Sequence, residues 1–403
     1  MQSVERFFRK DMQEKVKKVA LVICYFQHNY GSQLQALATQ MICDKLGVEN
    51  ETIRIDGLQP EINKAKYRYF LSRIGDVNTV KDKMATVRKL IAKRMNGGYR
   101  NNLAVRDAIF SEFAEKKFRL SRLYASKVEL SNCAHEYSTF IVGSDQLWLP
   151  SNIAADYYTL NFVPDSVNKV AYATSFGVSK LPKSQAEAAK KFLPRIDFIF
   201  VREISGKNLI NELTGMEVPV VCDPTLLFDR EEWNVLAPQK RRVVEPYVLC
   251  YFLGNNPQHR DWAKRLAEDT GCKIVQLPNL DEYIKSDNGF ADYPLYDVSP
   301  LDFVSLVRDA NYVLTDSFHC TVFSALFCKT FFSFRRYSND SAVSTNSRLY
   351  SLLDSLGLSD RLLTGKESVA ECLKKTLDTN AVLNCIEELR MESIELLKRA
   401  LRI

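Results

Sequence analysis

The fold is decided by residues 18–46, KVALVICYFQHNYGSQLQALATQMICDKL. Its first nine residues form an apolar run, the pattern of a strand that is buried on both faces of a parallel sheet. A short polar turn, HNYGS, follows, and residues 33–46 have the composition of a helix. Strand, turn and helix in this order predict the first unit of an open, parallel α/β sheet.

The same alternation continues and predicts a first α/β domain over residues 1–236. Further apolar runs are found at 138–143, 169–177, 197–203 and 218–224, and helical patterns at 183–193 and 203–213. Residues 57–127 interrupt the alternation with a basic stretch of mostly helical composition, which predicts an insertion. The charged stretch APQKRRVVEP at 237–246 is predicted to connect this domain to the next one.

A second round of alternation predicts another domain over residues 247–403. Its apolar runs lie at 247–254, 272–278, 311–316 and 330–334, its helical patterns at 261–270, 299–310 and 318–327, and a helical tail covers 367–403. Ser299 as N-cap and Pro300 at the first helical position mark the start of one helix. Two successive units of this kind predict two Rossmann-like domains that face a cleft, a GT-B-like arrangement with a helical insertion and a C-terminal helix.

Composition excludes several other classes of protein. A chain of 403 residues with 46% hydrophobic and 26% charged residues is too long for one core and too apolar for disorder. Its apolar runs are too short to cross a bilayer, and its first residues show no apolar signal-peptide region. Ten scattered cysteines without a CxxC pair, and only four histidines, predict reduced thiols and no metal site. We therefore expect a cytoplasmic protein.

Positive charge is concentrated between residues 81 and 127. This stretch carries 13 Lys and Arg against 4 Asp and Glu, whereas the whole chain has a net charge of +6. A solvated helical face is the favoured interpretation, and peripheral contact with an anionic membrane surface, or with a diphosphate-linked acceptor, is the alternative. No helix-turn-helix, zinc finger or RNP signature accompanies the charge, so nucleic acid is not an expected partner.

The stretch TDSFHCTVFSALF at 315–327 predicts a ligand site. A strand ends at Thr315, the chain turns, and His319 falls in the first turn of the next helix. Ligands of open α/β sheets collect beyond the carboxyl ends of strands, and the N-terminus of a helix attracts anions. A bound anion would favour a protonated imidazole, which suits a general acid. A capping or core histidine is an equally weighted alternative.

Arginines occupy the corresponding position after other apolar runs. Arg202 follows FIFV, Arg335 and Arg336 follow TFFSF, and Arg348 directly precedes a helical pattern. A guanidinium can bind a carboxylate or phosphate through two parallel hydrogen bonds. A structural ion pair between the domains is the alternative for Arg202. The predicted donor-binding residues are Ser317, Phe318, Arg202, Arg335 and Arg336.

Polar turns of the first domain supply candidate contacts to a sugar. The turn NYGS at 29–32 has one glycine, which is neither a GxGxxG fingerprint nor a P-loop, so a dinucleotide is not expected. The segment VGSDQLW at 142–148 offers polar groups for hydroxyls and an indole for an apolar sugar face. Turn geometry and simple packing explain these residues equally well. The predicted acceptor-binding residues are Asn29, Tyr30, Gly31, Gln33, Ser144, Asp145, Gln146 and Trp148.

Seven segments in order resemble the polysaccharide pyruvyl transferase family. They are NYGSQLQA, VGSDQLW, YATSFG, VREISG, CDPTLLF, TDSFHCTVFSALF and NSRLYSLLDSLGL, and they span residues 29 to 358. The resemblance implies a GT-B-like fold and no cofactor. It further implies transfer of pyruvate from phosphoenolpyruvate to two hydroxyls of one sugar, which forms a cyclic ketal on a polysaccharide or a lipid-linked precursor.

The resemblance also assigns roles to three residues. By matching motifs, His319 is the expected acid and Arg202 the expected clamp on the donor. Arg348 stands where some relatives carry a catalytic lysine, and since an arginine does not titrate in this range, electrostatic support is its expected role. Cys320 stands where relatives commonly have Gly or Ala, which weakens the expectation that the backbone approaches the donor closely here.

Two other functions remain as alternatives. A glycosyltransferase that uses a nucleotide sugar would share the same architecture, because a fold does not fix a function. A non-catalytic subunit of a glycan-assembly complex would bind a glycan without forming a product. Affinity for phosphoenolpyruvate, or for UDP- and GDP-sugars, distinguishes these possibilities.

Overall fold

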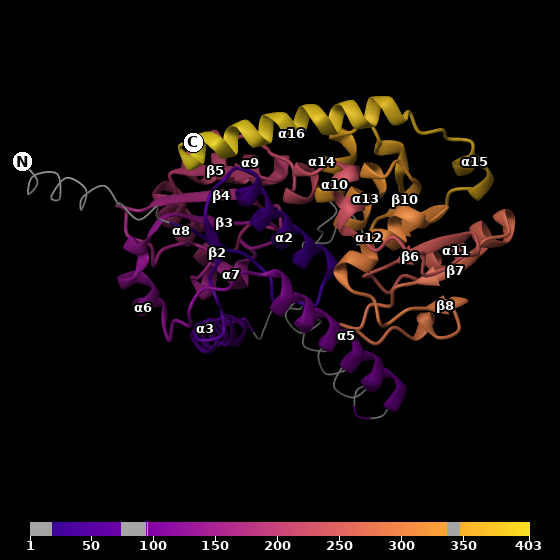
Figure 1. Cartoon of the computed structure of the whole chain (residues 1–403), viewed down its shortest axis with the longest axis horizontal. Helices are drawn as coiled ribbons and strands as arrows, with labels where there is room; N and C mark the ends of the chain where they lie inside the picture. The colour runs from indigo at the N-terminus through magenta and orange to yellow at the C-terminus, as the bar shows by residue number, and fades with distance from the viewer. Residues whose placement is uncertain (1–17, 74–93, 95, 337–346) are drawn as a thin grey trace, which may run out of the picture.

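The computed structural model describes residues 18–73, 94, 96–336 and 347–403, which form two parallel sheets flanked by helices (Figure 1). The first sheet has the order β2-β1-β3-β4-β5, and each neighbouring pair is parallel. Its strands are β1 (Lys18–Val22), β2 (Asn50–Thr52), β3 (Tyr137–Val142), β4 (Asn168–Thr174) and β5 (Phe198–Val201). The helices of this part are α2 (Tyr30–Lys45), α3 (Gln59–Leu71), α5 (Gly97–Lys117), α6 (Lys127–Asn132), α7 (Pro150–Ala155), α8 (Lys183–Phe192), α9 (Ile204–Thr214) and α10 (Arg230–Leu236).

The second sheet has the order β11-β10-β9-β6-β7-β8 and is also parallel throughout. Its strands are β6 (Tyr247–Tyr251), β7 (Lys273–Gln276), β8 (Tyr293–Pro294), β9 (Tyr312–Thr315), β10 (Thr330–Phe334) and β11 (Leu362–Leu363). The helices are α11 (Pro257–Thr270), α12 (Pro300–Asp309), α13 (Phe318–Leu326), α14 (Ser347–Ser355), α15 (Val369–Leu373) and α16 (Thr379–Leu401).

Both strand orders are those of doubly wound sheets. The first matches the flavodoxin-like order and the second the six-stranded Rossmann order, so the predicted pair of Rossmann-like domains is confirmed. The strand order reverses between β1 and β3 in one sheet, and between β6 and β9 in the other. Ligands bind beyond the carboxyl ends of strands at such points. The loop after β3 and the turn after β9 are therefore the places where each domain presents a site.

Local signals in the sequence explain where several helices begin. Ser299 and Asp302 form a reciprocal capping box at the start of α12, with Pro300 at the first helical position. Asn29 caps α2 by accepting a hydrogen bond from the Ser32 amide at 3.2 Å. Both satisfy amides that the helix itself leaves without partners.

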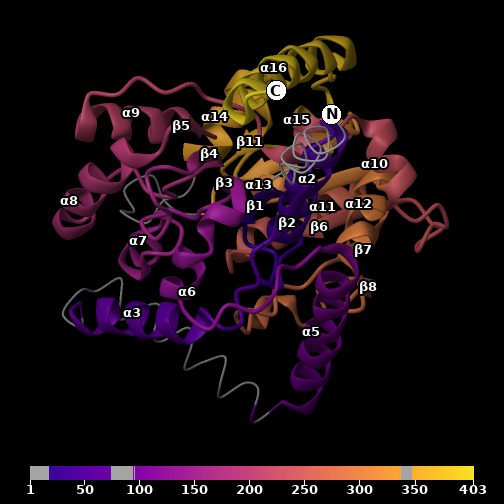
Figure 2. The same ribbon diagram turned by 60° about the vertical axis from the view of Figure 1, so that its left-hand side comes forward.

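One apolar core cluster extends across both domains. Tyr30 of the first domain stacks on Phe303 of the second, with ring centroids 4.9 Å apart. The last helix, α16, starts at the second domain and runs back across the first (Figures 1 and 2). There the side-chain amide of Asn168 donates to the Ala400 carbonyl at 2.9 Å. The C-terminal tail, assigned by sequence to the second domain, thus also packs on the first.

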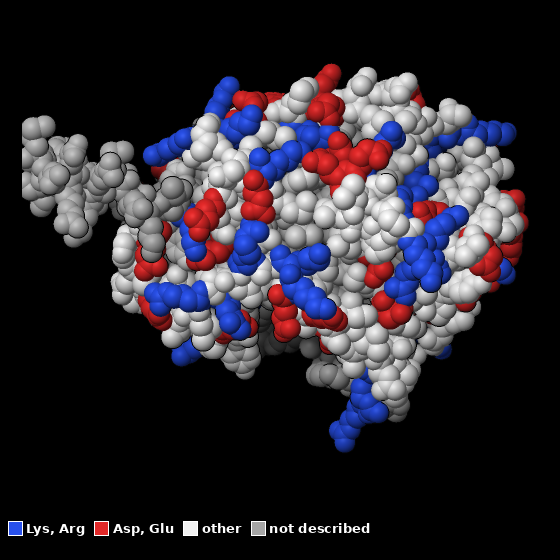
Figure 3. Space-filling view, in the orientation of Figure 1, with Lys and Arg blue, Asp and Glu red and all other residues white. Residues whose placement is uncertain are grey.

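The described part of the insertion connects the domains rather than standing free. The Tyr99 hydroxyl, on α5, donates to the Leu280 carbonyl of the second domain at 2.8 Å. Residues 74–93 and 95, which hold part of the basic stretch, lie outside the described residues. Several of the described basic side chains are ion-paired, as Arg119 is with Asp44. Figure 3 shows acidic and basic groups interspersed over most of the face of the molecule seen in Figure 1, with basic side chains at the outer end of α5.

The shortest elements of the fold could not be predicted. The apolar run at residues 218–224 forms only an isolated bridge at Val220 and leads into a short 3-10 helix, Pro224–Leu227. The edge strands β2, β8 and β11 were not predicted, because two or three residues give no readable alternation. Among the described residues, no helix is both long and apolar enough to cross a membrane.

Candidate active site

A buried polar cluster forms where the loops after β3 and β5 meet the turn after β9. Its centre is Arg202, whose side chain is 1% exposed and directly follows β5. Its Nη1 donates to Oδ2 of Asp223 at 2.8 Å, and its Nη2 lies 3.5 Å from Asp145. Burial lowers the pKa of Arg202, but Asp223, Asp145 and Glu203 together hold it above its ordinary value. Arg202 is therefore a permanent cation fixed by surrounding carboxylates.

Asp223 connects the two domains electrostatically. Besides Arg202, its Oδ2 accepts a hydrogen bond from the Ser144 hydroxyl at 3.1 Å and lies 3.4 Å from Nε2 of His319. Its Oδ1 accepts from the amide and hydroxyl of Thr225. Burial would raise the pKa of Asp223, but His319 and Arg202 hold it well below its ordinary value. The carboxylate is thus ionised and lies beside the imidazole of His319.

Asp145 follows β3 at the reversal point of the first sheet. Its φ of 68° lies in the left-handed region, which aspartate tolerates better than most residues. The Ser32 hydroxyl donates to its Oδ2 at 2.8 Å. Burial would raise the pKa of Asp145, but Arg202 and then His319 hold it below the ordinary value. Asp145 is therefore a second buried carboxylate that faces the same cationic groups.

His319 lies in the first turn of α13, as predicted, and is 6% exposed. It is in contact with the first turn of α2: a Cβ atom added to Gly31 would lie 2.0 Å from its Nδ1. The imidazole is consequently held between Gly31 of the first domain and the Asp223 carboxylate. The His319 ring can occupy this position only because residue 31 has no side chain.

Phe318 and Arg348 complete the cluster on the side of the second domain. The guanidinium carbon of Arg202 lies 4.3 Å from the centre of the Phe318 ring, and that of Arg348 lies 5.8 Å from it. Burial, and next the charge of Arg202, lower the pKa of Arg348 to about 10. Arg348 therefore stays charged at neutral pH, although two cations are close together. Such a pair suits a ligand with more than one negative charge.

The remaining arginines of the predicted donor site lie at the end of β10. Arg336 donates from Nη2 to the Asp316 carbonyl at 2.9 Å, and Arg335 lies 5.4 Å from the Tyr350 ring centre. The Asp316 carboxylate accepts the amides of Leu253 and Gly254 at 2.7 and 2.8 Å. The Asp316 carboxylate thus already occupies the backbone amides after β6, to which a free anion would otherwise bind.

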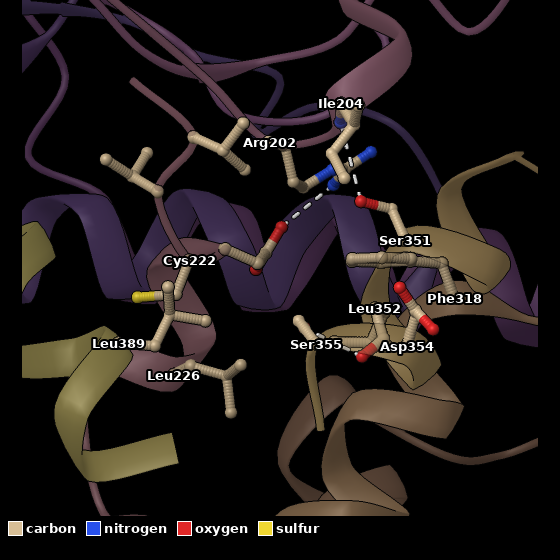
Figure 4. Close-up of a pocket in the computed structure, with 13 residues that line it drawn as sticks. Arg202, Ile204, Cys222, Leu226, Phe318, Ser351, Leu352, Asp354, Ser355 and Leu389 are labelled. Carbon is tan, nitrogen blue, oxygen red and sulfur yellow. Dashed lines mark hydrogen bonds and ion pairs between the residues drawn. The ribbon is translucent and has the colours of Figure 1, made fainter. Parts of the chain in front are cut away.

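A cavity of about 260 Å³ adjoins the cluster. Arg202, Asp223 and Phe318 are among the residues that line it, and Figure 4 shows Arg202 and Phe318 on its wall. Further walls come from α14, where Ser351 accepts a hydrogen bond from the Ile204 amide at 3.4 Å, and from α16. The cavity therefore lies between the two domains and gives access to the buried arginine.

A model of the polysaccharide pyruvyl transferase family matches residues 29–339, most of the chain. The chain belongs to this family. The matched range includes Asp145, Arg202, Asp223 and His319, and so covers most of the buried cluster of this family member. Arg348 lies beyond the matched range, and its place in the site rests on the geometry alone.

Several solved structures have a similar course of the backbone. They include UDP-GlcNAc 2-epimerase from Methanocaldococcus jannaschii (11% identity, TM-score 0.48, 96% of this chain and 99% of that one). Others are ADP-heptose lipopolysaccharide heptosyltransferase II from Escherichia coli (10%, 0.39, 93% and 99%) and the glycosyltransferase SnogD from Streptomyces nogalater (11%, 0.45, 96% and 98%). No curated protein matches the chain significantly. Because the identities and TM-scores are this low, we draw no conclusion from these similarities. The GT-B-like architecture is inferred from the two strand orders.

The side chains of three predicted acceptor-binding residues pack in the interior instead of joining the buried cluster. Trp148 is fully buried, and its indole N–H donates to the Tyr158 carbonyl at 3.0 Å, so it packs in the core. The Gln33 side chain is buried against α5, where it donates to a backbone carbonyl. Tyr30 is enclosed by rings at the domain boundary. Packing, the alternative explanation of such residues, accounts for Trp148.

The other predicted acceptor residues lie near the cluster or beside it. Ser144 and Asp145 belong to it directly, and Gly31 contacts His319. The side-chain nitrogen of Gln146 is buried and has no hydrogen-bond partner among the described residues. Asn29 lies at the edge of a different cavity.

Two acidic residues of the site were missed by the sequence analysis. Asp223 belongs to the segment CDPTLLF, and Glu203 directly follows Arg202. Glu203 accepts a hydrogen bond from the Ser175 hydroxyl at 2.5 Å and lies 3.7 Å from Nε of Arg202. Asp223 and Glu203 both follow an apolar run, which could have indicated a role in the site. An acidic residue at that position is, however, also typical of turns.

Replacing Gly31 with alanine should disrupt the site directly. The added Cβ would overlap the His319 ring, so the imidazole must rotate away or α13 must move. We expect kcat to fall by about a hundredfold, as a 1 Å misplacement of a reacting group does, and the free energy of unfolding to fall by about 1–3 kcal/mol. Gly97→Ala is the control, because the described atom nearest to its added Cβ is 3.9 Å away. Equal activity of both variants would contradict the assigned position of His319.

Replacing Arg348 with lysine should change the pH dependence more than the rate at neutral pH. Burial and the nearby Arg202 would lower the pKa of a lysine below its ordinary value of about 10.4, as they lower that of Arg348. The variant would thus lose its positive charge at a lower pH than the wild type. We expect an alkaline fall of kcat/KM that begins earlier. Superimposable profiles between pH 6 and 10 would show that this charge does not act on the reaction.

Proposed function

We propose that the protein transfers pyruvate from phosphoenolpyruvate to two hydroxyls of one sugar in a polysaccharide or a lipid-linked precursor. The observation that supports this is a set of buried side-chain nitrogens that have no hydrogen-bond partner among the described residues. They are Nε and Nη2 of Arg202, Nε of Arg348 and Nε2 of His319, with Glu203 and Asp145 3.7 and 3.5 Å from the two Arg202 atoms. Buried polar groups normally have partners, and unused donors on cations suit an anion with several acceptor oxygens.

Phosphoenolpyruvate carries the groups that such a cluster would bind. Its carboxylate and phosphate require two cationic positions, and the guanidinium groups of Arg202 and Arg348 lie 4.3 and 5.8 Å from the centre of the Phe318 ring. During transfer the methylene carbon gains a proton, sugar oxygens bond to the adjacent carbon, and phosphate leaves. His319 is the proposed proton donor, and the ionised Asp223 lies 3.4 Å from its Nε2. The buried setting strengthens each of these interactions relative to water.

The competing function is transfer of a sugar from a nucleotide donor. A diphosphate would need free amides and positive potential where the second sheet reverses its order. In this chain the Asp316 carboxylate already accepts the amides of Leu253 and Gly254 there. A negative charge at this point opposes a second anion, and this favours phosphoenolpyruvate at the Arg202 cluster instead.

Isothermal titration calorimetry with phosphoenolpyruvate, UDP-glucose and GDP-mannose tests the proposal. We expect saturable binding of phosphoenolpyruvate, with inorganic phosphate and pyruvate each binding more weakly because each uses half of the site. Binding of a nucleotide sugar alone would support the glycosyltransferase. A protein that binds glycan but releases no phosphate from phosphoenolpyruvate would be the non-catalytic subunit.

A further inference from the structure

A second cavity, of about 460 Å³, lies at the meeting point of three parts of the chain. One wall is the loop after β1, with Gln27 and His28, and another is one turn of α5, with Arg106 and Asp107. Asp281, from the loop that follows β7 in the second domain, forms the third. The cavity thus exists only when both domains and the insertion are assembled.

His28 and Asp107 form a pair at this cavity. Nδ1 of His28 lies 2.7 Å from Oδ1 of Asp107, and the two side chains are 30% and 40% exposed. A carboxylate at Nδ1 favours the tautomer with its proton on that nitrogen, which leaves Nε2 as an acceptor. Nε2 has no hydrogen-bond partner among the described residues. The imidazole is therefore fixed in orientation but retains one open position.

Arg106 holds the walls together. Its Nη2 donates to Asp107 at 3.2 Å and its Nη1 donates to Asp281 at 3.1 Å, while its own side chain is only 10% exposed. The bond to Asp281 connects α5 to the second domain across the cavity. Replacing any member would therefore affect the shape of the cavity as well as its polarity.

The chemistry of the walls favours an uncharged polyol. One guanidinium is balanced by two carboxylates, so the cavity carries no excess of positive charge that would retain a phosphate. Carboxylate, imidazole and amide groups together supply both donors and acceptors, as hydroxyl groups require. Phe26 adds an apolar surface at the edge. No group of three or more His, Cys, Asp or Glu suited to a metal ion occurs in the part of the chain that the structure describes.

The cavity is also close to His319. Gly31 contacts the His319 ring, and His28 precedes Gly31 by three residues in the same loop. Their Cα atoms are therefore at most about 11 Å apart, since consecutive Cα atoms are separated by 3.8 Å. The loop that carries His28 at this cavity thus leads directly into the helical turn that contacts His319.

We propose that this cavity binds the acceptor sugar, with His28 accepting a hydrogen bond from one sugar hydroxyl through Nε2. That the sugar is the acceptor rests on the proposed function, whereas its binding here rests on the cavity alone. The residues that recognise the acceptor are then His28, Arg106, Asp107 and Asp281, rather than Gln33 and Trp148.

Saturation-transfer difference NMR with p-nitrophenyl glucoside, galactoside and mannoside provides the test. The variants are His28→Ala and Gln27→Trp, whose bulky side chain fills the cavity without removing a charge. His135→Ala is the matched control, because His135 is exposed and, among the described residues, its ring bonds to the backbone carbonyl of Asn132. We expect at least one hexoside to bind the wild type saturably, about tenfold more weakly in His28→Ala, and not at all in Gln27→Trp. Phosphoenolpyruvate affinity should stay within a factor of two in all variants.

The outcomes separate this inference from the proposed function. Hexoside binding that is equal in wild type, His28→Ala and Gln27→Trp overturns the inference, as does the absence of binding to the wild type. Hexoside binding lost in Gln27→Trp, together with no release of phosphate from phosphoenolpyruvate, keeps the sugar site and refutes the transfer reaction. Phosphate release whose KM for the hexoside is unchanged in His28→Ala supports the reaction and places the acceptor elsewhere.

Discussion

Replacing His319 with alanine should lower kcat by about three orders of magnitude, the middle of the range for loss of a general acid. The imidazole is the proposed source of the proton for the methylene carbon, and its neighbour Asp223 cannot replace it because that carboxylate is held ionised. Affinity for phosphoenolpyruvate should change much less, since Arg202 and Arg348 remain. Release of phosphate at saturating donor and acceptor measures the first effect, and calorimetry the second.

A matched variant distinguishes proton transfer from simple loss of packing. His319→Gln keeps a side chain that can donate to Asp223 but cannot donate a proton to carbon. It should be as inactive as His319→Ala while unfolding closer to the wild-type temperature, because less of the buried volume is lost. Activity above a tenth of the wild type in either variant would remove His319 as the acid.

The parts of the site that could be predicted were those that depend on short-range sequence. His319 was located correctly because a strand, a turn and a helix lie within a dozen residues, and parallel sheets present their ligands there. The capping residues of α12 were equally readable. In each case the physical cause, a terminal amide that needs a partner or a positive helix end, acts within one turn.

The pairing of residues across the fold could not be read in the same way. Arg202 and Asp223 are 21 positions apart, and Asp223 meets His319 only after both domains close. Periodicity indicates which face of an element is buried but does not indicate which buried polar groups meet. Trp148 illustrates the same limit, because an indole after a strand suits either a sugar or a core, and only packing decides.

Replacing Arg202 with alanine should weaken phosphoenolpyruvate binding by at least about a hundredfold, because a desolvated, charge-assisted bidentate contact is lost. Arg202→Lys keeps the charge but cannot form two parallel hydrogen bonds, so it should recover only part of the affinity. Arg54→Ala removes an exposed pair with Asp56 and is the control, with no change expected in binding. Unchanged donor affinity in Arg202→Ala would leave Arg202 with a purely structural role.

Arg202→Ala should also destabilise the fold, by an amount that depends on pH. Without Arg202, the buried Asp223 loses one of the cations that depress its pKa, and breaking such a buried pair costs about 3–5 kcal/mol. A carboxyl group whose pKa is depressed by folding stabilises the native state above its unfolded pKa of about 3.9, and this contribution is lost as the pH falls. The difference in free energy of unfolding between wild type and Arg202→Ala should thus be largest near pH 7 and shrink below pH 4. Denaturant titrations at pH 7 and below pH 4 measure this difference in free energy of unfolding. A difference independent of pH would indicate that lost packing, rather than the uncompensated carboxylate, causes the destabilisation.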